Sequence, residues 1–267
     1  MLRSFHKMHG LGNDFVIFDA RVEPLVTPPA LARALADRQT GIGCDQLILL
    51  QASNRASLRM TIFNSDGSSA EACGNAARCV VALTGAERIE TAGRVIEGAK
   101  DGTSVEVAMG EPGFAWHEIP LAYAMDTAAL PMAWDELGQP MAVNVGNPHL
   151  IFFVEDIDEK RLKLLGPQIE HDTAFPDAIN VNVARIAGNG IELRTWERGA
   201  GLTLACGTGA CATAVAAIRS KRCRSPVEVQ MKGGTLTIAW AAGEQVRMRG
   251  PATHVFSGEI DLAAFAP

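Results

Sequence analysis

The chain has 267 residues, of which 48% are hydrophobic, and its formal net charge is −6. This length and composition are typical of a globular protein with one large or two small domains, and the lack of a basic run argues against nucleic-acid binding. The first residues, MLRSFHKMHGLGNDF, lack the apolar segment of a signal peptide, and no apolar run approaches the roughly 18–20 residues of a membrane span. We therefore expect a cytoplasmic protein with no nucleic-acid or membrane partner.

The first half of the sequence carries strand-like and helical patterns. Alternating or continuous apolar residues predict strands at residues 14–20, 45–51 and 58–64. A helix with prolines in its first turn is predicted at 28–38, and a second helix, ended by glycine, at 74–85. Further short strands are predicted at 88–91, 94–99 and 103–110.

The second half repeats this theme after the Pro/Gly-rich stretch GEPGFAWHEIPLAY at 110–123. Helices are predicted at 158–169 and 207–223, and strands at 149–156, 179–186, 191–197, 227–231, 235–240 and 245–250. Many strands with one long Ala-rich helix per half favour an α+β fold. A helix that is apolar on all sides is buried, so each half is expected to wrap a mixed or antiparallel sheet around a central helix.

The phrase EACGNAARC at residues 71–79 returns as LACGTGAC at residues 204–211. Cys73 and Cys206 are 206 − 73 = 133 residues apart, which is half of the 267-residue chain. Self-similarity at a fixed offset indicates an internal repeat.

Two further matches occur at this offset. Asn64 and Glu197, which each end a strand-like run, are 197 − 64 = 133 residues apart, and GNDFVIF at 12–18 returns as GNPHLIF at 146–152. The chain is therefore predicted to consist of two homologous, pseudo-twofold-related halves. We place them at 1–118 and 119–254, with a tail of residues 255–267 that packs back onto the first half.

Each repeated cysteine directly precedes a glycine that opens a predicted buried helix. The unpaired N–H groups and the dipole of a helix N-terminus stabilise anions, so the pKa of a thiol there can be lowered and a carboxylate can be bound. Gly74 and Gly207 allow close approach of a ligand to the backbone. If the two halves share one cleft, Cys73 and Cys206 would stand on opposite faces of one carbon. One thiolate would remove an α-proton and the other thiol would return a proton from the opposite side, which inverts the stereocentre.

Two other interpretations of these segments stay open. GTGACA at 207–212 matches a variant of the dinucleotide fingerprint, with Glu228 following 228 − 207 = 21 residues later, although its twin lacks the second glycine. A duplicated binding module without catalysis would also explain the repeat. The C-x5-C and C-x4-C spacings are not those of zinc knuckles, so no metal site is expected. The remaining cysteines are predicted to lie in the core: Cys44, Cys79, Cys211 and Cys223.

The sequence closely resembles diaminopimelate epimerases. The matching segments occur in family order: KMHGLGNDFVIFDA (7–20), GIGCDQLILL (41–50), IFNSDGSSAEACGNAARC (62–79), VGNPH (145–149), FPDAINVNVA (175–184) and ERGAGLTLACGTGACA (197–212). The related proline racemases usually carry Cys-Gly-His, which is absent here, and phenazine-type isomerases lack the cysteine pair. The resemblance implies the fold of this family and a cofactor-independent isomerase, expected as a homodimer, that interconverts LL-2,6-diaminopimelate and meso-diaminopimelate for lysine and peptidoglycan synthesis.

The resemblance also implies roles for individual residues. Cys73 and Cys206 would be the acid/base pair, and His149 and Glu197 match residues that tune the thiols. The carboxylate at the reacting carbon would be held by Gly74, Asn75, Gly207 and Thr208. The rest of the substrate would be recognised by Asn13, Gln46, Asn64, Asn147, Asn180, Glu197 and Arg198. Amide side chains suit both amino and carboxylate groups, and an arginine fork suits a carboxylate.

Some features depart from the family pattern or have a purely structural interpretation. Asparagines beside glycines are typical of turns, and Asn75 and Thr208 could be helix caps. Ala76 stands where the family often has glycine, and Leu202 where many members have glutamate. A racemase of another amino acid on the same fold, of the histidine or proline type, therefore stays an alternative.

Overall fold

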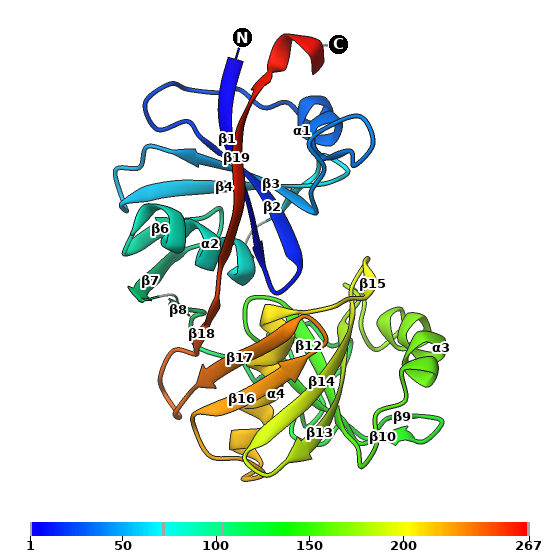
Figure 1. The fold of residues 1–267 in the computed structure, drawn as a ribbon. Coiled ribbons are helices and arrows are strands. Elements are labelled where there is room, and N and C mark those ends of the chain that lie inside the picture. Colours follow the sequence, from blue (N-terminus) through cyan, green and yellow to red (C-terminus); the bar gives the residue numbers. More distant parts are fainter. Residues whose placement is uncertain (1, 71–72, 103, 266–267) are drawn as a thin grey trace. The chain divides into compact units, whose positions relative to one another are not determined.

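The computed structural model describes residues 2–70, 73–102 and 104–265, and it divides into two compact units. The first unit comprises residues 1–107 and 250–267, and the second comprises residues 108–249. The chain leaves the first unit within strand β8 (Ser104–Ala108) and returns to it within strand β18 (Arg247–Pro251) (Figure 1). The sequence analysis set these divisions at 118/119 and 254/255, whereas the structure assigns the Pro/Gly-rich stretch 110–123 to the second unit.

The first unit is a mixed sheet with two α-helices. Its other strands are β1 (Leu2–Gly10), β2 (Asn13–Asp19), β3 (Gln46–Gln51), β4 (Leu58–Asn64), β5 (Ser69–Ala70), β6 (Arg88–Glu90), β7 (Val95–Asp101) and β19 (Thr253–Asp261). The helices are α1 (Pro29–Ala36) and α2 (Gly74–Thr84), followed at the C-terminal end by the short 3-10 helix η1 (Leu262–Phe265). Strand β1 pairs antiparallel with both β2 and β19, so the last strand of the chain lies beside the first.

The second unit has the same design. Its remaining strands are β9 (Ala133–Trp134), β10 (Leu137–Gly138), β11 (Met141–Asn144), β12 (Pro148–Phe153), β13 (Asn180–Ala187), β14 (Gly190–Glu197), β15 (Gly201–Leu202), β16 (Val227–Met231) and β17 (Gly234–Ala239). Its helices are α3 (Glu159–Glu170) and α4 (Gly207–Arg219). One core cluster of this unit gathers between the sheet and α3, around Leu150, Leu162 and Val181.

The two units share one topology, to which the second unit adds β9 and β10 and the first unit adds β19. The order β1-β2-α1-β3-β4-β5-α2-β6-β7-β8 recurs as β11-β12-α3-β13-β14-β15-α4-β16-β17-β18. Seven strand pairings of the first unit return in the second with the same direction, including the parallel pairs β2–β3 and β12–β13. The predicted α+β fold and the predicted duplication are therefore present in the structure.

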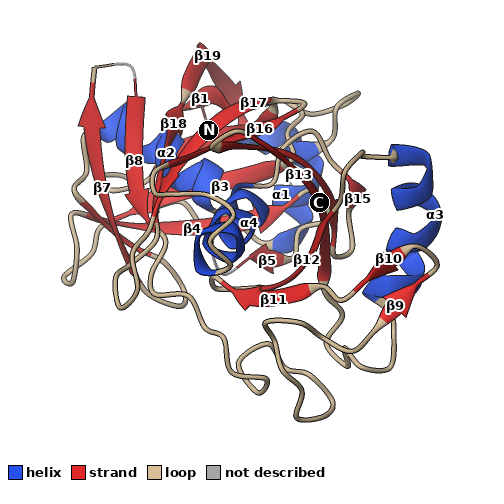
Figure 2. Ribbon diagram, turned by 90° about the horizontal axis from the view of Figure 1, so that it is seen from below, coloured by secondary structure: helices blue, strands red, loops and turns tan. Residues whose placement is uncertain are grey.

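The two helices that begin after the repeated cysteines are buried, as predicted. In α2 the first eight residues, from Gly74 to Val81, are all buried. Helix α4 contacts strands β11, β12, β13, β14, β16 and β17, and Figure 2 shows it inside the strands of its unit. Five alanines of α4 are fully buried, because small side chains let strands approach a helix closely from several sides.

Some strands of the structure were not predicted, and some helices begin or end at other residues than predicted. Strands β1 and β19 were not predicted, because LRSFHKMHG and THVFSGEID show no clear alternation of apolar and polar residues. The helix predicted to 223 ends at Arg219, and the helix predicted at 158 begins after Asp158, which caps it. The strand predicted at 103–110 starts at a residue outside the described ones. No described helix is both long and apolar enough to cross a membrane.

Candidate active site

In the first unit, Cys73 is the N-cap residue of α2. Its backbone is extended, and its carbonyl accepts the first helical bond from Ala77 N at 2.9 Å. Gly74 and Asn75 form the first turn and are buried. The N–H groups of a first helical turn have no partner within the helix, so this turn offers donors for an anion next to the thiol.

Asn13 lies directly against the Cys73 thiol. Its Nδ2 donates to Asp45 Oδ2 at 3.0 Å, which turns its Oδ1 toward Cys73 Sγ, 3.7 Å away. The same Oδ1 accepts from Asn75 Nδ2 at 3.3 Å, and Asn75 Oδ1 accepts from the fully buried Arg78 at 2.9 Å. A chain of fixed amides therefore places a carbonyl oxygen where it can accept the proton of the Cys73 thiol.

Gln46 and Asn64 face each other across strands β3 and β4. Gln46 Nε2 donates to Asn64 Oδ1 at 3.0 Å, and Asn64 Nδ2 donates to Ser68 Oγ at 3.0 Å. Gln46 Oε1 is buried and has no hydrogen-bond partner among the described residues. A buried acceptor without a partner is costly, so this oxygen is free to accept from a donor outside the chain.

In the second unit, Cys206 occupies the same place as Cys73, as the N-cap of α4. Its Sγ accepts from Gly209 N at 3.3 Å and lies 3.4 Å from Thr208 Oγ1. Gly207 opens the helix and is buried, as is Gly209. A Cβ on Gly209 would lie 2.6 Å from Asn182 Oδ1, so only glycine fits here without displacing Asn182.

The environment of Cys206 keeps its thiol protonated. Burial and the negative charge of Glu197, which is hydrogen-bonded to the thiol, raise the pKa of Cys206 well above its ordinary value, against the lowering effect of Thr208 and Gly209. Glu197 is held in turn by Thr203 Oγ1, which donates to Glu197 Oε1 at 2.5 Å. The expectation of a lowered thiol pKa at this helix start is therefore wrong for Cys206, because burial and the carboxylate outweigh the helix amides.

His149 is fully buried and neutral. Asn182 Nδ2 donates to His149 Nδ1 at 3.1 Å, so the ring proton sits on Nε2, which donates to Asn147 Oδ1 at 3.0 Å. Burial, together with the positive charge of Arg198, lowers the pKa of His149 to about 3. His149 therefore acts at neutral pH through its hydrogen bonds. Its partner Asn182 also packs against Gly209 in the first turn of α4, so it links His149 to that turn.

Asn180 and Arg198 are joined beside this group. Asn180 is buried and donates through Nδ2 to Pro148 O at 2.8 Å, and its Oδ1 accepts from Arg198 N at 3.0 Å. The exposed Arg198 side chain donates through Nη1 to Asp177 O at 2.8 Å. The strand register brings these side chains together. In the first unit Gln46 is directly opposite Asn64. In the second, Asn180 precedes Val181, which is opposite Trp196, so Asn180 lies near the end of β14.

The structure thus groups the predicted residues within each unit. In the first unit Asn13, Gly74 and Asn75 lie around Cys73, and Gln46 is hydrogen-bonded to Asn64. In the second unit Glu197, Gly207 and Thr208 lie around Cys206. There Asn147 is hydrogen-bonded to His149, and Asn180 to Arg198. Sequence reasoning missed Asp45, Arg78 and Asn182. Asn182 had a readable signal, since it stands two residues after Asn180 on the same face of a strand.

The remaining cysteines lie in the core, as predicted. Cys79 and Cys211 are fully buried, and Cys44 and Cys223 nearly so. Burial raises the pKa of Cys79 to about 12 and the pKa of Cys44 to about 11. Within residues 2–70, 73–102 and 104–265, no three His, Cys, Asp or Glu side chains are placed to hold a metal ion.

The dinucleotide interpretation of GTGACA does not fit the local structure. The strand before α4 is β15, which has two residues and pairs antiparallel with β14. A dinucleotide fingerprint needs a full parallel strand that leads directly into the glycine turn and helix. The residues between β15 and α4 are instead a loop that ends at Cys206.

Comparisons with known proteins identify the family of the chain. The family model for diaminopimelate epimerase matches residues 5–115 and 141–255. A diaminopimelate epimerase of Rhizorhabdus wittichii is 61% identical over 264 residues, covering 98% of this chain and 96% of that protein. One of Sphingopyxis alaskensis is 57% identical over 267 residues, covering 99% and 100%. Among solved structures, a hydroxyproline epimerase from Agrobacterium vitis has a TM-score of 0.66 at 15% identity, covering 97% of this chain and 91% of that chain, which shows a shared fold.

Proposed function

The chain belongs to the diaminopimelate epimerase family, and we propose that it interconverts LL-2,6-diaminopimelate and meso-diaminopimelate with Cys73 and Cys206 as its acid/base pair. The protein is thus an isomerase of lysine and peptidoglycan precursor synthesis. One observation carries the assignment of the pair: a cysteine caps the buried helix at the same point of both topological repeats.

The proposed reaction moves two protons and no other group. A thiolate takes the α-hydrogen as a proton, so the C–H bond breaks, an S–H bond forms, and the electron pair spreads into the α-carboxylate. The second thiol then gives its proton to the opposite face of the carbon and becomes the thiolate. Amides at the first turns of α2 and α4, including those of Gly74 and Gly207, stabilise the carboxylate as its negative charge grows.

The two thiols exchange roles with the direction of the reaction. Where Cys206 is the acid, burial and Glu197, which raise its pKa, favour its protonated form, and Cys73 is the base. In the reverse direction Cys73 is the acid, and its S–H is directed at Asn13 Oδ1. Cys206 must carry a thiolate in the second direction, where the donors Thr208 and Gly209 stabilise the sulfur.

The amide pairs recognise the distal part of the substrate. Gln46 Oε1 is a buried acceptor that suits an ammonium group. Arg198 is exposed and anchored at one nitrogen, so the rest of its planar fork suits a carboxylate. Together with Asn13, Asn64, Asn147 and Asn180, they match a substrate that has an amino and a carboxylate group at both ends.

The direct test uses purified protein in deuterated water with LL-diaminopimelate. The protein is first dialysed against a chelator and hydroxylamine, and full activity afterwards supports a cofactor-independent reaction. Product formed early should carry deuterium at the inverted carbon while remaining substrate carries little, because a second base supplies the proton. Product that retains the substrate's own α-hydrogen would refute the two-base mechanism, and turnover of histidine or proline in place of diaminopimelate would refute the substrate.

Serine variants test the assignment of the pair. Cys73→Ser and Cys206→Ser should each lose several orders of magnitude in activity in both directions, because a serine hydroxyl is a poor acid and base near neutral pH. Cys79→Ser and Cys211→Ser are the matched controls from the same two helices and should stay active when folded. Near-normal turnover by either of the first two variants would end the proposal.

We also propose that the protein acts as a cytoplasmic homodimer. Thiols that serve as acid and base must stay reduced, which the cytoplasm ensures. Strand β19 pairs with β1 and exposes Val255 and Phe256 to 54% and 47%, an apolar strip that a second copy would cover. Light scattering of the purified chain that gives the mass of one copy, at concentrations well above the cellular range, would contradict the dimer.

A further inference from the structure

A buried carboxylate lies behind the turn that carries Glu197 and Arg198. Glu170 is the last residue of α3, and it is 4% exposed. Its Oε2 accepts from Trp196 Nε1 at 2.7 Å, and its Oε1 accepts from Gly199 N at 2.7 Å. Trp196 directly precedes Glu197–Arg198 and Gly199 directly follows it. One carboxylate is therefore hydrogen-bonded on both sides of this pair.

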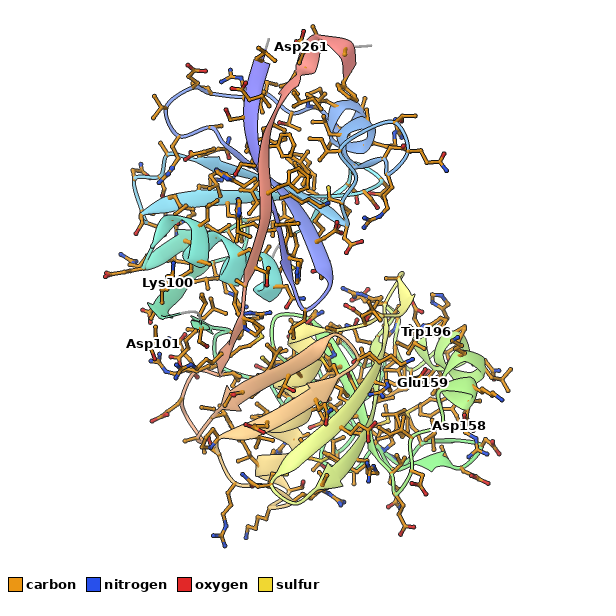
Figure 3. The ribbon with its side chains drawn as sticks, in the orientation of Figure 1. Lys100, Asp101, Asp158, Glu159, Trp196 and Asp261 are labelled. Atoms are coloured by element: carbon orange, nitrogen blue, oxygen red, sulfur yellow. The ribbon has the colours of Figure 1, made fainter. Side chains whose placement is uncertain are left out.

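Helix α3 is shaped to receive Trp196 at this point. Gly166 stands four residues before Glu170 and therefore on the same helix face. A Cβ at Gly166 would lie 2.5 Å from Trp196 Cδ2 and 2.6 Å from its Cγ. Figure 3 shows Trp196 on the side of the unit that α3 covers, in agreement with the contacts between α3 and β14. Gly166 thus leaves the space for the indole ring and Glu170 fixes its N–H.

We propose that Glu170 is a positioning residue that holds the Glu197 carboxylate against Cys206. This inference rests on the proposed function for the catalytic role of Cys206, but the geometry stands on its own contacts. The hydrogen bonds of the Glu170 carboxylate go to Trp196 and Gly199. It fixes the turn between β14 and β15, and that turn decides whether the Glu197 carboxylate meets the Cys206 sulfur.

These two hydrogen bonds require a carboxylate at position 170. Both oxygens of Glu170 accept an N–H, and an ionised carboxylate can accept at both while donating at neither. In Glu170→Gln one oxygen is replaced by an NH2 group that faces either Trp196 Nε1 or Gly199 N. Because both groups are donors, that hydrogen bond is lost. Glutamine has almost the same size, so the change tests charge and hydrogen bonding and leaves the packing in place.

The experiment measures Cys206 directly. The rate of iodoacetamide labelling of Cys206 is followed against pH by peptide mass mapping, in the wild type and in Glu170→Gln. Cys206 is faced by the carboxylate of Glu197, whose charge raises its pKa, and by the Thr208 hydroxyl and Gly209 amide, which lower it. Release of the turn should therefore move the labelling midpoint to lower pH, and kcat should fall by about one to two orders of magnitude with a smaller change in KM.

Three further variants keep the test decisive. Gly166→Ala pushes a methyl group into the indole ring and should shift the midpoint in the same direction, even if Glu170→Gln folds poorly. Trp196→Phe removes one donor, so adding Glu170→Gln to it should cost less than in the wild type, because the glutamine oxygen can then face Gly199 N. Glu192→Gln is the control, a carboxylate of the same strand that pairs with Arg185 and Arg194, and it should leave the midpoint unchanged.

An unchanged Cys206 midpoint in both Glu170→Gln and Gly166→Ala would overturn the proposal, whatever happens to activity. A midpoint that shifts equally in Glu192→Gln would overturn it as well. The labelling needs no substrate, so it tests Glu170 even if the wild-type protein fails to epimerise diaminopimelate. Failure of the proposed function and failure of this inference are thereby distinguishable.

Discussion

The buried neutral His149 should make the second unit sensitive to acid. The perturbation is a change from pH 7 to pH 5, applied to the wild type and to His149→Gln. In the folded unit the pKa of His149 is lowered to about 3 by burial and by Arg198, whereas an unfolded histidine has a pKa of about 6.5. Between these values the unfolded chain binds a proton that the folded chain does not, so stability is full above about pH 6.5 and is lost as the pH falls toward 3.

The size of the effect follows from the two pKa values. A pH of 5 is about 1.5 units below the pKa of the unfolded histidine, so the unfolded chain is protonated there while the folded His149 is still neutral. At 1.36 kcal/mol per unit, the free energy of unfolding is therefore lower by about 2 kcal/mol than at pH 7. The side chain is fully buried, so solvent does not screen this loss. In His149→Gln the overall stability should be lower at both pH values, because Asn182 loses an acceptor, but the His149 share of the pH slope should disappear.

The chain provides a convenient probe for this measurement. All four tryptophans, Trp116, Trp134, Trp196 and Trp240, belong to the second unit, so their fluorescence in urea reports the unfolding of the unit that holds His149. His117→Gln, at an exposed position of the same unit, serves as the control and should keep the wild-type slope. Equal loss of unfolding free energy between pH 7 and pH 5 in the wild type and in His149→Gln would refute the reasoning.

Three other results are expected. Glu197→Gln removes the negative charge beside Cys206, so the pKa of that thiol should fall, seen as labelling of Cys206 by iodoacetamide at lower pH than in the wild type; an unshifted profile would show that Glu197 does not set the pKa. Gly209→Ala should destabilise the second unit by about 1–3 kcal/mol in urea unfolding and reduce kcat, because its Cβ would overlap Asn182 Oδ1 at 2.6 Å, whereas unchanged stability would mean that the pocket relaxes freely. Removal of metal ions by a chelator should leave kcat unchanged in a direct assay of isomer interconversion, and loss of activity that added Zn²⁺ or Mg²⁺ restores would contradict it.

The repeated cysteine phrase allowed much of the fold to be predicted. The offset of 133 residues between Cys73 and Cys206 indicated a duplication, and the apolar helices after them indicated burial on all sides. These signals are local or self-similar, so one sequence is enough to read them. By contrast, β1 and β19 pair across almost the whole chain, and β19 is exposed along most of its length, so burial imposed no pattern on its residues.

The acid/base properties of the site were harder to predict. A helix start indicates a lowered thiol pKa, but the pKa of Cys206 is raised because the thiol is buried and the Glu197 carboxylate lies against it. That contact depends on the turn after β14, and the turn depends on Glu170 in a separate helix. Helix propensity and residue spacing do not report such contacts between elements. For Asn182, the spacing from Asn180 on one strand face was a sequence signal, but its contacts with His149 and Gly209 could be seen only in the structure.

The path of the chain through its two units sets an order for biosynthesis. The second unit is one continuous segment, residues 108–249, whereas the first needs residues 250–267 to be complete. On the ribosome, which makes the chain from its N-terminus, the second unit therefore emerges whole while β1 still waits for β19 to pair beside it. Until then β1 has only β2 beside it, and the main-chain groups on its other side are open to other strands. Translation that stops just short of residue 250 would release a finished second unit attached to an open first one, so residues 250–267, which are made after the second unit, complete the first unit.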